Sequence, residues 1–156
     1  MIQTYRPQWK GDFERLNRAW IEKLFVMEPQ DYQLFNDPEN EVIQGDGMIF
    51  FILEEGSPVA TAGVKPYGEH GFELVKMAVD EKARGKGYAR QLSMHAIDFA
   101  KQKGKEFIVL YTHSSLTPAI ALYKSLGFEN VEVEKGKYAR ADVKMQLNIW
   151  KVTKNP

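Results

Sequence analysis

Residues 72–103 read FELVKMAVDEKARGKGYARQLSMHAIDFAKQK, and the interpretation of the whole chain starts from this stretch. Residues 72–79 are mostly apolar or β-branched and contain neither Gly nor Pro, which predicts a strand. A helix is expected between Gly87 and Gly104, because one apolar face recurs at helical spacing at Ala89, Leu92, Ala96 and Phe99.

A short basic loop, Arg84-Gly85-Lys86-Gly87-Tyr88-Ala89, joins this strand to the helix. Its two glycines allow a tight turn with inward-pointing N–H groups, and the first helical turn adds unpaired donors and a partial positive charge. Arg84, Lys86 and Arg90 add full positive charges. The loop is therefore predicted to bind an anion such as a phosphate or pyrophosphate.

The loop alone leaves the identity of the anion open. The nucleotide-binding pattern G-x-x-x-x-G-K-[ST] is absent, and a dinucleotide fingerprint would need a third glycine at Arg90. A strand-to-helix turn with solvated charges is an equal alternative for a bare G-x-G.

Two segments carry a resemblance to a known family. Residues 73–79, ELVKMAV, and the pattern [QR]-x-x-G-x-[GA] filled by Arg84, Gly87 and Ala89 resemble the signature of the GNAT superfamily of acyl-CoA N-acyltransferases. AIALYKSLGF at residues 119–128 is similar to the family's A-x-x-L-Y-x-x-x-G-F. Leu116 departs from the family, which often has at that position an Asn that reaches the cofactor arm.

The resemblance implies that acetyl-CoA is the acyl donor, with its pyrophosphate on the basic loop and its pantetheine arm along the end of the strand. The cofactor-binding residues implied are Met77, Ala78, Val79, Arg84, Gly85, Lys86, Gly87, Tyr88, Ala89 and Arg90. The implied reaction is transfer of an acetyl group to a primary amine, on a small molecule or on a protein or peptide, by direct attack in a ternary complex. A homodimer is left open. The alternatives are a non-catalytic acyl-CoA-binding sensor or interaction module and, third, a nicotinamide-dependent oxidoreductase.

Two residues are candidates for proton transfer. Tyr123 is the predicted general acid, because family members commonly place this hydroxyl near the cofactor sulfur; its plain alternative is a core aromatic residue. Glu73 is the predicted base, through water, since a carboxylate with a raised pKa could accept the amine's proton. Its alternative is a solvated residue at a strand start. His113, just past a predicted strand, could reach the same cleft, although a lone His is more often a satisfied polar residue.

The expected fold is α/β (α+β), with a mixed, mostly antiparallel central sheet and about four flanking helices in one domain over residues 1–156. The order expected of the GNAT fold is β-α-α-β-β-β-α-β-α-β-β. The strands are predicted at 2–6, 48–54, 59–65, 72–79, 107–111, 128–133 and 138–149. Besides the helix after Gly87, helices are predicted from Asp12 to Leu24, from Pro38 to Gly45 and from Pro118 to Gly127, with Asp12, Asp37 and Thr117 as N-caps.

The composition of the chain argues against several classes of protein and of functional site. Lys plus Arg and Asp plus Glu are both 21, so net charge gives no reason to expect a nucleic-acid partner. The chain has no cysteine, which excludes disulfides and a thiolate nucleophile, and no His and carboxylate spacing predicts a metal. The N-terminus lacks a signal-peptide core, and the longest apolar run, residues 48–53, is too short to span a membrane. A cytoplasmic location without a membrane partner is expected.

Residues 26–46 contain six acidic residues and no Lys or Arg. GNAT enzymes usually frame the acceptor cleft with their N-terminal helices, so uncompensated carboxylates there would favour cationic amines. The sequence therefore predicts a preference for polyamines or lysine-like acceptors. The plain alternative is that these acids cap helices and face water.

Overall fold

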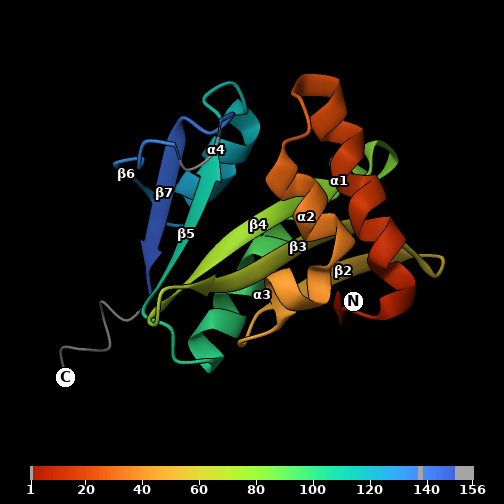
Figure 1. The fold of residues 1–156 in the computed structure, drawn as a ribbon, viewed down its shortest axis with the longest axis horizontal. Helices are drawn as coiled ribbons and strands as arrows, with labels where there is room; N and C mark the ends of the chain where they lie inside the picture. Colours follow the sequence, from red (N-terminus) through yellow and green to blue (C-terminus); the bar gives the residue numbers. More distant parts are fainter. Residues whose placement is uncertain (1, 137–138, 150–156) are drawn as a thin grey trace.

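The computed structural model describes residues 2–136 and 139–149. Within them, seven strands form one sheet in the order β1-β2-β3-β4-β5-β7-β6, in which β4 and β5 are parallel and the other neighbours are antiparallel (Figure 1). The strands are β1 Ile2–Thr4, β2 Met48–Glu54, β3 Ser57–Tyr67, β4 Gly71–Val79, β5 Phe107–Thr112, β6 Glu129–Val131 and β7 Val143–Asn148.

The α-helices in the described residues cover both faces of the sheet. They are α1 Lys10–Leu24, α2 Pro29–Asn36, α3 Tyr88–Gln102 and α4 Thr117–Ser125. Figure 1 shows α1 and α2 on one face and α3 on the other. The order of strands and α-helices is the one expected from the sequence.

Two apolar cores lie on the two sides of β2. Ile49 and Phe51 pack with the side chains of α1 and α2, whereas Phe50 and Ile52 pack with those of α3. Because helices cover both faces, β2 reads as a continuous apolar run instead of alternating with polar residues.

The N-terminal helices differ from the prediction. Lys10 begins α1, two residues before the expected cap Asp12, because a 3-10 turn at Pro7–Trp9 leads into it. α2, which begins at Pro29, was not among the predicted helices: Glu28 and Asp31 form a reciprocal capping box at its start. The helix expected after Asp37 is a π-helical turn, Glu39–Ile43, and Asp37 Oδ1 accepts a hydrogen bond from the Asn40 N–H at 3.4 Å.

The C-terminal elements are shorter than predicted. Leu116, and not Thr117, is the N-cap of α4, and the final hairpin is confined to β6 and β7. Tyr138, expected to start the last strand, lies outside the described residues. The single domain over residues 1–156 stays a prediction.

The parallel pair β4–β5 opens at one end. Its register runs from Gly71↔Phe107 to Leu74↔Leu110, and the two strands then diverge toward the side that carries α4 and the end of α1 (Figure 1). Just after this point β4 bulges: Lys76 has φ +55°, and the register with β3 shifts between Thr61 and Gly63. The bulge and the divergence leave a gap in the sheet.

Gly47, directly before β2, has the least room for a side chain among the glycines of the described residues. A Cβ there would lie 1.6 Å from the Val42 carbonyl oxygen and 2.7 Å from that of Val64. We expect Gly47→Ala to destabilise the protein by about 2 kcal/mol or more in urea unfolding, since backbone atoms must shift. Gly11→Ala, whose Cβ would meet nothing within 4 Å in α1, is the control and should be neutral or slightly stabilising. Equal losses in the two variants would contradict this packing argument.

Candidate active site

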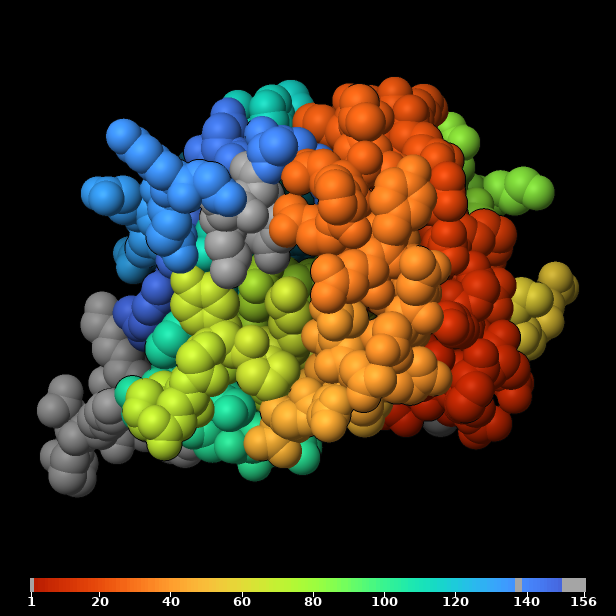
Figure 2. Space-filling view, viewed as in Figure 1, coloured from red at the N-terminus to blue at the C-terminus, as the bar shows by residue number. Residues whose placement is uncertain are grey.

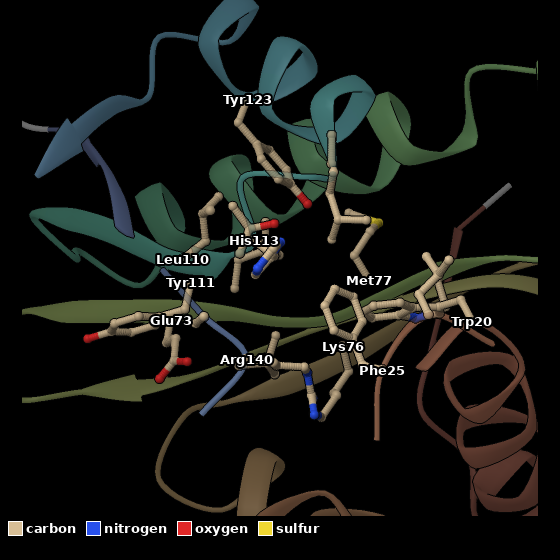
Figure 3. Close-up of a pocket in the computed structure, with 18 of the residues that line it drawn as sticks. Trp20, Phe25, Glu73, Lys76, Met77, Leu110, Tyr111, His113, Tyr123 and Arg140 are labelled. Carbon is tan, nitrogen blue, oxygen red and sulfur yellow. The ribbon is translucent and has the colours of Figure 1, made fainter. Parts of the chain in front are cut away.

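A cavity of about 530 Å³ occupies the gap between β4 and β5. Residues of α1, α2, β4, β5, α4 and the segment before β7 line it. Figure 3 shows Tyr123 entering from α4, Glu73 and Tyr111 on one side, and Trp20 and Phe25 on the other. The cavity therefore draws its walls from both halves of the chain.

The basic loop lies at one end of the gap, before α3. Gly85 and Gly87 have φ values of +81° and +80°, and a Cβ at either position would meet nothing within 4 Å. Gly87 is the N-cap of α3 and supplies no side-chain cap, so the first-turn N–H groups keep their capacity to bind an anion. The loop backbone thus fits a diphosphate group.

The charged side chains of the loop do not all point to one place. Lys86 Nζ donates to Glu54 Oε2 at 2.8 Å, and the Tyr88 hydroxyl donates to the same oxygen at 2.5 Å. Arg90 donates to Ser125 Oγ at 2.8 Å, whereas Arg84 lines the cavity. The backbone and Arg84 therefore carry most of the anion-binding capacity, and the Lys86 charge is shared with Glu54.

The end of β4 has an open edge toward β5. Met77, Ala78 and Val79 line the cavity beyond the last β4–β5 pair. On its other side β4 pairs with β3 up to Val79. The edge that faces the cavity can therefore pair with an extended ligand such as the pantetheine arm.

Tyr123 is both a core residue and a cavity residue. Its ring packs edge-on to Phe128 at a centroid distance of 5.8 Å, and the side chain is only 6% exposed. The hydroxyl points into the cavity (Figure 3) and has no hydrogen-bond partner among the described residues. Burial raises the pKa of Tyr123 to about 12, so the hydroxyl stays protonated at neutral pH.

Glu73 is buried in β4 and lines the same cavity, which excludes the solvated strand-start alternative. Beside it, the Tyr111 hydroxyl contacts Tyr67 and Glu134, with O···O distances of 3.0 and 2.9 Å. Burial, and next the hydrogen bond with Tyr67, raise the pKa of Tyr111. Glu73 and Tyr111 thus bring polar groups to a mostly apolar cavity.

His113 also lines the cavity, at the end of β5. Its Nδ1 lies 2.8 Å from Ser115 Oγ, and its ring meets Phe25 edge-on with centroids 5.3 Å apart. This ring contact joins the end of β5 to the end of α1 across the gap.

A buried charge cluster that the sequence did not reveal lies under the cavity. Asp31 is fully buried and accepts two hydrogen bonds from Arg140, both at 2.7 Å, and one from Lys76. Burial raises the pKa of the Asp31 carboxyl, but the hydrogen bonds from Arg140 and Lys76 outweigh burial and hold the pKa well below its ordinary value. Burial lowers the pKa of Lys76, and the hydrogen bond with Asp31 offsets only part of this decrease.

This cluster changes the interpretation of the acidic stretch at residues 26–46. Asp31 is compensated by Lys76 and Arg140, and Glu28 pairs with Arg140 at 3.1 Å. Both bases line the cavity, so the predicted field of uncompensated carboxylates is wrong for these two acids. The expected preference for cationic amines loses its main support.

Other cavity residues were not predicted from the sequence, although some of them had a local signal and others had none. Trp20 and Leu24 lie four residues apart on one helical face and both line the cavity, where Leu24 is 55% exposed. Their spacing was a usable signal. Arg140 had none, because its partner lies 109 residues away.

The fold and the cavity together define a class of protein: an α/β chain whose sheet parts at a parallel strand pair, with a glycine loop and an uncapped helix beside the gap. Residues 6–128 match the model of the Acetyltransferase (GNAT) family. The chain belongs to this family, whose general reaction is transfer of an acetyl group from acetyl-CoA to an amine. The family resemblance and the fold expected from it are confirmed.

Individual relatives agree with this membership. The chain is 32% identical over 120 residues to the uncharacterized N-acetyltransferase YjgM of Escherichia coli, covering 74% of the chain and 67% of the relative. Six other curated relatives are longer, and the chain spans only 22% to 40% of their length.

Solved structures show the same fold. A GNAT-family acetyltransferase of Staphylococcus aureus Mu50 superposes with a TM-score of 0.87 at 18% identity, over 96% of this chain and 98% of that one. The yncA protein of Salmonella typhimurium, solved with acetyl-CoA, has a TM-score of 0.73 at 19% identity, over 96% and 93% of the two chains.

Two features are absent from residues 2–136 and 139–149. No helix there is long and apolar enough to cross a membrane. No group of three or more His, Asp or Glu side chains there is arranged to hold a metal ion.

Because the Asp31 pKa is lowered in the folded state, Asp31 stabilises the fold above its unfolded pKa of about 3.9, and this contribution is lost as pH falls toward the folded pKa. We expect Asp31→Asn to cost about 3–5 kcal/mol at pH 7, measured by urea unfolding, and less as pH falls below about 4. Asp46→Asn is the control, since that carboxylate is exposed and should matter little at either pH. A loss for Asp31→Asn that is independent of pH would contradict the assignment.

Proposed function

We propose that this protein transfers an acetyl group from acetyl-CoA to a primary amine by direct attack in a ternary complex, in the cytoplasm. The observation that carries the proposal is the Tyr123 hydroxyl, which points into a cavity bounded by the open edge of β4. A binding module without turnover would not need a protonated, unpartnered hydroxyl at this place. A homodimer stays a prediction.

The residues present fit acetyl-CoA. The N–H groups of the Arg84–Ala89 loop and of the first turn of α3 would hold the pyrophosphate, with Arg84 as the nearest cavity cation. Met77, Ala78 and Val79 would pair with the pantetheine arm through the backbone. Bound there, acetyl-CoA would supply an activated thioester to the attacking amine.

Proton transfer is assigned to two buried side chains. Tyr123 donates a proton to the leaving thiolate, because its raised pKa keeps it protonated and its hydroxyl faces the cavity. Glu73 accepts the proton of the attacking amine through water, since its side chain lines the same cavity as Tyr123. The chain has no cysteine, so no thiol of its own can carry the acetyl group.

The acceptor is assigned to the part of the cavity that α1, α2 and the segment before β7 enclose, which we call the acceptor end. Trp20 and Phe25 supply aromatic surface there, and Lys76 and Arg140 line the wall beside them. The proposal therefore favours an amine on an apolar or aromatic body over a polyamine. Rates of thiol release with a panel of small-molecule and peptide amines decide whether that body is a small molecule or a peptide.

Cofactor binding can be tested without turnover. Coenzyme A or acetyl-CoA at a hundred times its Kd should add about 2.7 kcal/mol and raise Tm by several degrees, whereas NAD should not. Gly87→Val should abolish the shift, since a side chain would occupy the space of the diphosphate. Gly56→Val is a matched control, because both glycines have φ +80° and open surroundings. Equal shifts with NAD, or retention of the shift in Gly87→Val, would overturn the loop assignment.

Turnover tests the role of Tyr123. Tyr123→Phe keeps the ring packing and removes the proton, so kcat for thiol release from acetyl-CoA with the best amine should fall by about 100-fold or more. The coenzyme A thermal shift should stay unchanged. Tyr32→Phe, at an exposed position on α2, serves as the control. A normal kcat in Tyr123→Phe would mean that Tyr123 is only a core aromatic residue. If the unsubstituted protein releases no thiol with any amine, the binding-module alternative is favoured.

A further inference from the structure

Residues 139–142, which we name the strap, run from α2 to the end of β5. At one end, Ala139 N–H donates to Glu28 Oε1 at 3.2 Å, and Arg140 donates to Glu28 and Asp31. At the other end, Asp142 accepts hydrogen bonds from the Ser114 N–H and hydroxyl at 2.8 and 2.7 Å. In Figure 2 the blue residues around the strap meet the orange α1–α2 region.

The strap forms a wall of the acceptor end of the cavity. Arg140 and Ala141 both line the cavity, together with Phe25 and His113, which meet across the same gap. The Arg140 side chain crosses from the C-terminal half of the chain to α2, and it is the only element of the strap that reaches the buried Asp31. Displacing Arg140 would therefore open this end of the cavity.

Asp31 has a second positive partner, so such opening does not leave this buried carboxylate alone. Lys76 Nζ, held by the β4 bulge, bonds to Asp31 Oδ1 and lies 5.6 Å from the centre of the Phe35 ring. Its side chain is only 12% exposed, and it belongs to the body of the sheet rather than to the strap. If Arg140 moves away, Lys76 still compensates the carboxylate.

We propose that Arg140 and Asp31 close the strap over the acceptor end of the cavity, and that Lys76 is the residue that permits the strap to open. All three are positioning residues. Lys76 favours opening for two reasons: it keeps Asp31 paired in the open state, and its charge repels that of Arg140 in the closed state. That the cavity end admits the acceptor rests on the proposed function, but the motion of the strap does not.

The absence of cysteine from the chain makes opening measurable with one introduced thiol. Leu34→Cys puts a thiol on α2 at a cavity-lining position that is 6% exposed, one helical turn from Asp31. Its rate of reaction with a maleimide reports opening of this end of the cavity. Met94→Cys, at a position on α3 that is 50% exposed, reports general reactivity.

Two substitutions that each remove one positive partner of Asp31 should have opposite effects. Added to Leu34→Cys, Arg140→Gln should speed labelling by at least roughly tenfold, whereas Lys76→Met should slow it several-fold. The thiol of Met94→Cys should label at one rate in all backgrounds, and urea unfolding of each variant checks that labelling does not follow global unfolding. Changes of the same sign in both variants, or no change in Arg140→Gln, would overturn the proposal.

Kinetics then separate positioning from general damage. With the best amine of the panel, Arg140→Gln should raise KM for the amine at least several-fold while KM for acetyl-CoA stays unchanged, and Arg140→Lys should partly restore the amine KM. A change in both KM values without rescue by Lys would argue against a specific role for the strap. Because labelling needs neither acetyl-CoA nor an acceptor, failure of the strap proposal and failure of the proposed function give different results.

Discussion

The site depends on the point where β4 and β5 stop pairing. Parallel strands normally continue side by side under their covering helices, but here the register ends at Leu74↔Leu110 while β4 runs on to Val79. The bulge at Lys76 bends β4 immediately after the last pair. The divergence frees the backbone edge of β4, creates the cavity, and turns the Lys76 side chain toward α2.

The order of strands and helices could largely be predicted because most elements, although not α2, carry a local signal. The apolar run of β2, the period of α3 and the glycines beside them depend only on neighbouring residues. Errors arose where a local signal has two meanings. Glu28-Pro29 can end one helix or begin the next, and only the reciprocal hydrogen bonds between Glu28 and Asp31 decide between them.

The cavity was predictable only in part, for the same reason. Tyr123 and the basic loop belong to contiguous motifs, so the sequence indicates them directly. Arg140 lies outside these motifs. Lys76 lies within ELVKMAV, but its role, like that of Arg140, arises from one buried carboxylate that is distant in the sequence from both. No window of neighbouring residues contains that information.

Charge patterns show most clearly why local sequence is insufficient for substrate prediction. A stretch without Lys or Arg appears to present a negative surface, yet two of its acids point inward and are paired with bases from β4 and from the strap. The electrostatic field at a cavity depends on which charges remain unpaired after folding, and pairing is a property of the tertiary structure. For this reason the proposed function assigns recognition of the acceptor to the aromatic surface of Trp20 and Phe25 and not to the acidic residues. The same buried pairs that cancel this charge fix the strap in place, so one carboxylate, Asp31, determines both the charge and the shape of the acceptor end.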